Sequence, residues 1–185
     1  MKTRLQEKYV REVIPSMMAK FGYKNVMAVP KVEKVTVNVG AGRISTEPKF
    51  KDRIEKDLAL ITGQRPTFKK AKKSVSGFKV RQGMTVGFVS TLRGKRMFDF
   101  LDRLISIALP RSRDFRGLEA RSFDQRGSLS IGIKEQIIFP EIAYESSKDI
   151  FSFQVNVATT AKAKEEGIEL LKLMGFPIKN NNLNI

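Results

Sequence analysis

Apolar and polar side chains alternate along several short stretches of the chain, which is typical of β-strands with one buried face. Residues 32–39 place valines on one face and Lys, Thr and Asn on the other. The same period of two recurs in residues 128–133 and 151–157, and residues 85–92 form a further predicted strand.

Apolar residues at spacings of three and four predict helices between these strands. Residues 3–21 carry one such stripe and end at Gly22, and Pro15 is expected to kink or divide this helix. A second helix is expected to start near Thr46 and to stop at Gly63.

Two more helices are predicted in the second half of the chain. Residues 94–109 are strongly apolar, and Pro110 is expected to terminate that helix. Thr159 or Thr160 can cap a last helix that runs to residue 174 and is closed by Gly175.

This arrangement predicts an α+β fold with an antiparallel or mixed sheet of about five strands and helices packed on one face. The chain has 185 residues and is expected to form a single α+β domain, residues 1–185. A protruding basic loop is expected at about residues 69–84, and a short C-terminal tail at residues 176–185.

The sheet face turned away from the helices is predicted to carry small or neutral hydrogen-bonding side chains. Such a face lets the sugar and phosphate groups of RNA approach closely. A solvated face, or one buried against another protein, is the alternative interpretation. The residues assigned to this face are Thr36, Asn38, Gly87, Val89, Thr91, Ser130, Gly132, Ser152, Gln154 and Asn156.

The charge distribution favours a nucleic-acid partner. Lys and Arg total 35 against 19 Asp and Glu, so the net charge is +16 and the pI is about 10.2. Residues 58–98 contain ten cations and no acidic side chain. The resulting field concentrates polyanions around this segment, although a solvated loop that only maintains solubility is the alternative.

The basic segment has two parts. Residues 69–83 contain spaced Gly and Ser and are predicted to form a flexible surface loop whose cations suit phosphates. Phe78 in this loop can anchor the loop to the core or stack on a base, and anchoring is the more frequent role. Residues 93–96 lie at a predicted helix N-terminus, where cations oppose the helix dipole unless an anion is bound.

Composition excludes several classes of catalytic site. The chain has no His and no Cys, so the usual proton shuttle, the thiol nucleophile, zinc ligation by these residues and disulfides are absent. The carboxylates of Glu135, Glu141, Asp114 and Asp124 have no spacing that places two in one cleft. Residues 40–42 lack the rest of a dinucleotide or P-loop motif. We therefore expect no enzyme, no cofactor and no metal site.

The N-terminal residues 1–20 are charged throughout, and no stretch approaches the roughly 20 apolar residues of a membrane span. We therefore expect a cytoplasmic protein with no membrane partner and no small-molecule substrate. The residues alone leave two other classes open. One is a free RNA-binding regulator or chaperone, and the other is a phosphoryl-transfer enzyme or nuclease with carboxylates clustered around a metal.

Five groups of residues, in order and in register, resemble the bacterial ribosomal protein L5 family of the large subunit. They are residues 58–66, 71–83, 91–94, 107–117 and 132–141. The resemblance covers nearly the whole chain, from residue 9 to residue 174. It departs at Thr67 and Lys69, and the tail after Met174 is longer than is usual in the family.

The resemblance implies a structural, non-enzymatic component of the central protuberance that binds 5S rRNA with its open sheet face. The matching positions are Asn38, Gln64 and Thr91, and Thr36 and Arg93 adjoin them. It also implies 23S rRNA and other central-protuberance ribosomal proteins as partners, and a location in the large subunit of the cytoplasmic ribosome.

Two further surfaces are implied by the same resemblance. The basic loop would contact the P-site tRNA through Lys72, Lys73, Ser74, Gly77, Phe78, Lys79 and Arg81. The segment after Pro110 would face a small-subunit head protein at an intersubunit bridge through Arg111, Arg113 and Arg116. Ion pairs of these arginines with Asp114 or Glu119 are the alternative explanation.

Overall fold

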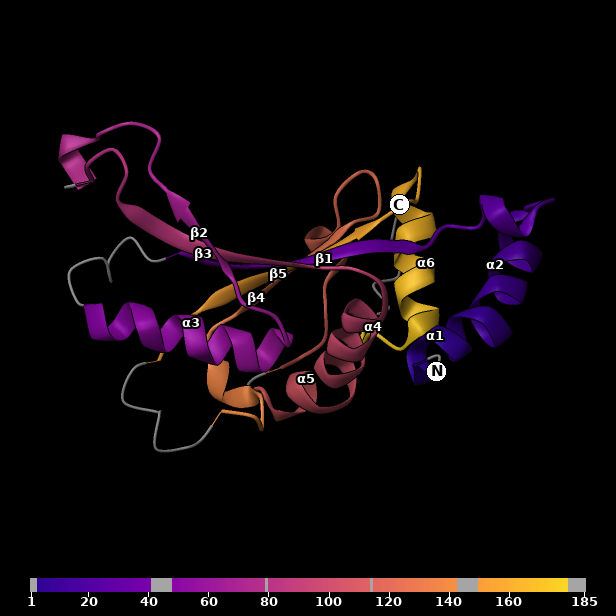
Figure 1. Cartoon of the computed structure of the whole chain (residues 1–185). Coiled ribbons are helices and arrows are strands. Elements are labelled where there is room, and N and C mark those ends of the chain that lie inside the picture. The colour runs from indigo at the N-terminus through magenta and orange to yellow at the C-terminus, as the bar shows by residue number, and fades with distance from the viewer. Residues whose placement is uncertain (1–2, 41–47, 79, 114, 143–149, 180–185) are drawn as a thin grey trace. The chain divides into compact units, whose positions relative to one another are not determined.

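The computed structural model describes residues 3–40, 48–78, 80–113, 115–142 and 150–179 (Figure 1). Five strands form an antiparallel sheet in the order β2-β3-β1-β5-β4, which confirms the predicted α+β class. The helices are α1 (Arg4–Lys8), α2 (Ile14–Phe21), α3 (Pro48–Thr62), α4 (Gly94–Arg103), α5 (Leu109–Arg111) and α6 (Lys164–Met174). The strands are β1 (Val32–Gly40), β2 (Thr67–Lys70), β3 (Thr85–Leu92), β4 (Leu129–Ile133) and β5 (Phe153–Thr159).

The chain divides into two compact units. The first unit comprises Met1–Val35, Arg93–Ile131 and Asn156–Ile185, and the second comprises Thr36–Leu92 and Gly132–Val155. The single-domain organisation stays a prediction.

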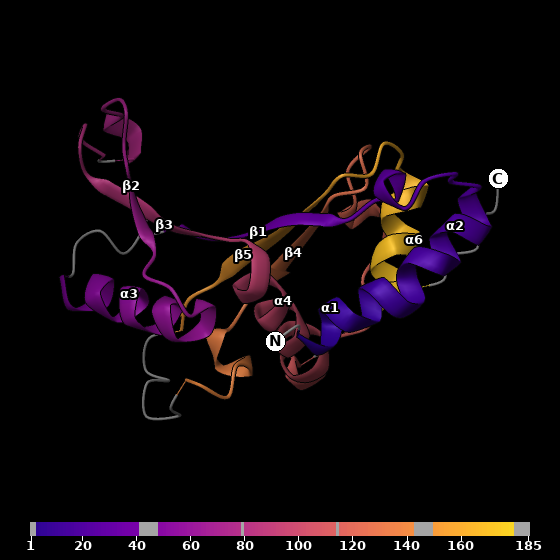
Figure 2. The same cartoon turned by 45° about the vertical axis from the view of Figure 1, so that its right-hand side comes forward.

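The second unit contains α3, which packs against the strands of this unit. In both views α3 lies along one side of the strands, and it is the only α-helix among the described residues of this unit (Figures 1 and 2). Ile54, Leu58 and Ile61 form its fully buried stripe. The helix ends at Gly63, whose φ of 68° is left-handed, as predicted. The expected start at Thr46 lies outside the described residues.

In the first unit, α1 and α2 form one continuous helical segment despite Pro15. A π-helical turn, Tyr9–Val13, joins them, and the N–H of Ile14 donates to the carbonyl of Tyr9. A proline ring clashes with the carbonyl four residues before it, and the wider π turn makes room for that ring. The predicted end at Gly22 is confirmed, with a φ of 70°.

The prediction that Pro110 terminates its helix is wrong, for the same reason. A second π-helical turn, Leu104–Ala108, follows α4, and the N–H of Leu109 donates to the carbonyl of Leu104. The helix therefore continues through Pro110 in α5 and ends at Arg111.

The predicted cap of the last helix at Thr159 or Thr160 is also wrong. Thr159 is the last residue of β5, and the N–H of Thr160 donates to the carbonyl of Lys31 at 2.9 Å. Helix α6 begins only at Lys164, where the carboxylate of Glu166 accepts backbone N–H bonds from the two residues before the helix.

The strand β2 was not predicted from the sequence. All four of its residues are exposed, and it is held by antiparallel pairing with β3. Lys69 and Lys70 therefore belong to a strand and not to the flexible loop in which the sequence placed them. Lys69 pairs with Gly87 and Lys70 with Thr85, so β3 carries a bulge between these positions.

We expect Gly87→Ala to destabilise the protein by about 1–3 kcal/mol, as overpacking does. A Cβ atom at Gly87 would lie 2.8 Å from the carbonyl oxygen of Val39, a backbone atom that cannot move without shifting β1. Urea unfolding would measure the difference. Gly132→Ala on β4 is the matched control, because nothing lies within 4 Å of the added Cβ. Equal stabilities of the two variants would contradict the close approach.

We also predict a pH-dependent gain in stability from Asp57→Asn. Burial in α3 raises the pKa of the Asp57 carboxyl, and the nearby Arg53 offsets this only in part. As the pH rises through the ordinary pKa of about 3.9, the unfolded chain ionises first, so the wild type loses stability that the variant keeps.

Urea unfolding between about pH 4 and pH 7 would therefore show the variant gaining on the wild type as the pH rises. Asp52→Asn, at an exposed position of the same helix, is the control and should show no such trend. A difference in unfolding free energy between Asp57→Asn and the wild type that does not depend on pH would contradict the raised pKa of Asp57.

Candidate nucleic-acid interface

The side of the second unit opposite α3 carries uncharged polar side chains. Thr36 and Asn38 of β1 and Thr91 of β3 are half-buried, while their sequence neighbours on the other side are buried. Ser152 and Gln154 are exposed, although Ser152 lies just before β5. The predicted alternation is therefore present, and these five outward side chains are neutral hydrogen-bonding groups, whereas Val89 of β3 is a half-buried apolar residue of the same set.

Gln64 and Thr91 are brought together by a hydrogen bond. The Nε2 of Gln64 donates to the carbonyl oxygen of Thr91 at 3.1 Å. The hydroxyl of Thr62, at the end of α3, donates to the carbonyl of Leu58 at 2.7 Å and lies 3.0 Å from the carbonyl of Gln64. These bonds fix the turn after α3, so Gln64 lies beside the last residues of β3.

Gly87 differs from the other residues assigned to the open face, because it is buried. Its α-carbon lies beneath the carbonyl of Val39 in the neighbouring strand. Residue 87 must therefore be glycine because β1 comes so close, and Gly87 is not exposed for contact with a ligand.

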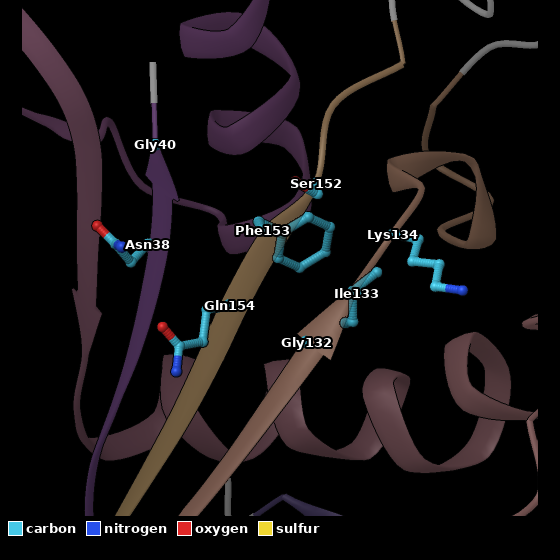
Figure 3. A pocket seen from close by; sticks show the side chains of 8 residues that line it. All are labelled: Asn38, Gly40, Gly132, Ile133, Lys134, Ser152, Phe153 and Gln154. Atoms are coloured by element: carbon cyan, nitrogen blue, oxygen red, sulfur yellow. The ribbon is translucent and has the colours of Figure 1, made fainter. Parts of the chain in front are cut away.

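An open hollow of about 500 Å³ lies over β1, β5 and β4 (Figure 3). We call it the β1–β5–β4 hollow. It is lined by Asn38, Gly40, Gly132, Ile133, Lys134, Ser152, Phe153 and Gln154. Of these, Lys134 was not assigned to this face from the sequence, although the alternation that places Ser130 and Gly132 there extends to residue 134.

The basic loop, residues 71–84, joins β2 to β3 and is held by its own hydrogen bonds. The N–H of Ala71 donates to the carbonyl of Met84 at 2.8 Å, and Val75 and Val80 form a β-bridge. The N–H of Gln82 donates to the hydroxyl of Ser74 at 2.9 Å. Hydrogen bonds within the loop therefore connect its two sides, and its flexibility stays a prediction.

Most of the described side chains of this loop are exposed to solvent. Phe78 is 80% exposed, so the interpretation that it anchors the loop to the core is wrong. Lys72, Lys73, Ser74, Gly77 and Arg81 are exposed as well. Lys79 lies outside the described residues.

Arg93 and the arginines after Pro110 belong to the first unit. Arg93 precedes α4 in an extended conformation and is exposed, as are Lys95 and Arg96 in the first turn of the helix. Three cations thus lie at a helix N-terminus, as predicted. Such a terminus favours a bound anion.

Arg111, Arg113 and Arg116 are all exposed. The alternative explanation placed them in ion pairs with Asp114 or Glu119. The carboxylate of Glu119 instead pairs with Arg121 and Lys179. Asp114 lies outside the described residues.

Of the carboxylates considered for catalysis, Asp124 has a structural role. Asp124 accepts backbone N–H bonds from Arg126 and Ser128 at 2.9 and 2.7 Å, which makes it a turn residue. Within the described ranges, no group of three or more acidic side chains could hold a metal ion. No helix in the same ranges is long and apolar enough to cross a membrane. The Gly-Ala-Gly stretch at residues 40–42 falls mostly outside these ranges.

Comparison with known proteins supplies independent findings. Residues 25–81 match the family described as "Ribosomal protein L5", and residues 85–178 match the "ribosomal L5P family C-terminus". The chain is 55% identical to "Large ribosomal subunit protein uL5" of Carboxydothermus hydrogenoformans, over 94% of this chain and 97% of the relative. It is 54% identical to the protein of the same name from Syntrophomonas wolfei, over 95% of this chain and 99% of the relative.

Proposed function

Since the chain belongs to the ribosomal protein L5 family, a non-enzymatic component of the large ribosomal subunit, we propose that its open sheet face binds 5S rRNA. The half-buried, uncharged face made by Thr36, Asn38 and Thr91 supports this role most directly. RNA offers 2′-hydroxyls and base edges that neutral donors and acceptors can recognise by shape and hydrogen bonding. The working location is the cytoplasmic ribosome.

Gln64 has two roles in this proposal. Its Nε2 holds the carbonyl of Thr91, which leaves the Oε1 of the same carboxamide to accept a bond from the RNA. The bond also fixes the position of Gln64, so less side-chain entropy is lost when RNA binds. Arg93, exposed before α4, adds a phosphate contact.

The cationic surfaces have a different task. The exposed lysines of the basic loop contact the P-site tRNA, and Phe78 offers an aromatic face for stacking. Arg111, Arg113 and Arg116 face a small-subunit head protein at an intersubunit bridge. The remaining positive charge meets 23S rRNA and neighbouring central-protuberance proteins, as the net charge of +16 favours.

We expect Asn38→Ala and Thr91→Ala each to weaken 5S rRNA binding by about 2- to 10-fold, which corresponds to the loss of one net hydrogen bond. Binding to an unrelated RNA of equal length should stay nearly unchanged. Gln64→Ala should behave alike, but its unfolding free energy must be measured too, because the bond to Thr91 is lost. Filter binding across a salt series measures all three. Equal losses for both RNAs would refute selective recognition by this face.

The double variant Lys72→Ala, Lys73→Ala should leave 5S rRNA binding nearly intact. It should weaken protection of the P-site tRNA on assembled ribosomes, because contacts with tRNA phosphates are lost. Each lost contact should also lower the slope of log K for tRNA binding against log salt by about 0.7–0.9. Chemical footprinting of the tRNA measures the effect. Lys162→Ala, at an exposed lysine far along the chain from the loop, is the charge control. An unchanged tRNA footprint would contradict the role of the loop.

A further inference from the structure

The β1–β5–β4 hollow has the chemistry of a nucleotide pocket. We propose that it accepts one unpaired nucleotide of 5S rRNA, with its base against Asn38 and Gln154 and its phosphate at Lys134. The inference rests on the proposed function, because it assigns one nucleotide of the same RNA to one place on the open face. It adds Gln154, Gly132 and Lys134 to the binding residues.

Two carboxamides from neighbouring strands provide the polar groups of the hollow. Asn38 comes from β1 and Gln154 from β5, and both side chains extend in the same direction (Figure 3). A carboxamide presents a donor and an acceptor side by side, which matches the hydrogen-bonding edges of bases. Within the described part of the chain, neither carboxamide has a hydrogen-bonding partner. Both are therefore available to a ligand.

Two apolar residues form part of the floor of the hollow. Phe153 and Ile133 are 4% and 6% exposed, and both line the hollow. A volume of about 500 Å³ is in the range of sites that hold small organic ligands. Because Phe153 and Ile133 are buried and alternate with the outward-facing Gln154 and Gly132, a base in the hollow would lie over the backbone of β5 and β4, with its edge beside the carboxamides.

Gly132 has no structural reason to be glycine. It is exposed on β4, its φ is not left-handed, and nothing lies within 4 Å of a Cβ built there. Glycine weakens a strand, and in a strand interior it often marks a place where a ligand comes close to the backbone. A side chain at this position would enter the hollow, so glycine keeps the hollow open.

The charge of the lining favours a nucleic acid over an acidic or apolar peptide. The eight lining residues include one cation and no acidic residue. Lys134 is exposed just after β4 and extends beyond the strand at the rim of the hollow (Figure 3). A base in the hollow and a phosphate at its rim match this division between neutral groups and one positive charge.

Gly132→Val tests the proposal in the full-length protein. Valine is favoured in strands, and nothing lies within 4 Å of the Cβ atom that it adds, so the unfolding free energy should not fall. Affinity for 5S rRNA should fall about tenfold or more, since a lost base contact has effects of that size. Chemical probing of the 2′-hydroxyls should show one nucleotide that the wild type protects and the variant leaves reactive.

Ser130→Val is the matched control. Ser130 is exposed on the same face of β4 but does not line the hollow, so its variant should lose at most the affinity of one hydrogen bond and should leave the probed nucleotide protected. Lys134→Ala should lower the slope of log K against log salt by about 0.7–0.9 without changing the preference for 5S rRNA.

Wild-type affinity and an unchanged reactivity pattern for Gly132→Val would overturn the pocket. So would equal losses for Gly132→Val and Ser130→Val, or loss of a ribosomal protein partner with RNA binding retained. The proposed function would survive each of these results if Asn38→Ala and Thr91→Ala still weaken 5S rRNA binding and leave binding to an unrelated RNA nearly unchanged. It fails separately if the wild type does not prefer 5S rRNA over an unrelated RNA.

Discussion

Burial of the strands on one side only is the constraint on which the rest of the structure depends. Val35, Val37 and Val39 of β1 are fully buried, and Thr36 and Asn38 between them stay half-exposed. Each buried valine contributes about 1.5–3 kcal/mol, and a slip of one residue would expose all three. The packing that stabilises the fold therefore also decides which polar groups face outward.

The sequence predicts most of this fold because the period-two pattern reports burial directly. It predicts β1, β3 and β4 closely, and misplaces the ends of β5 by two residues. It does not predict β2, since an exposed strand with no apolar face owes its conformation to pairing with β3. The errors at Pro110 and Thr160 have a similar origin. A π-helical turn and a bond to Lys31 are set by the surrounding structure and not by local propensity.

Some features of the candidate interface could likewise be predicted from the sequence, and others could not. Its neutral character could be predicted from alternation alone, as Thr36 and Asn38 show. The bond between Gln64 and Thr91 joins residues 27 positions apart, and the hollow needs strands that are not consecutive to lie side by side. Phe78 was misjudged because exposed aromatic residues are uncommon, whereas here the loop backbone is held without it.

The internal bonds of the basic loop also affect how it meets a moving partner. Fixing a backbone residue costs roughly 1–2 kcal/mol in entropy, and the hydrogen bonds within this loop reduce the part of that cost that falls on binding. A loop that needs little reorganisation can bind and release a partner at rates set mainly by diffusion and charge. In its proposed role the basic loop would thus bind and release successive tRNAs quickly, and ionic strength would set how long each tRNA stays bound to it.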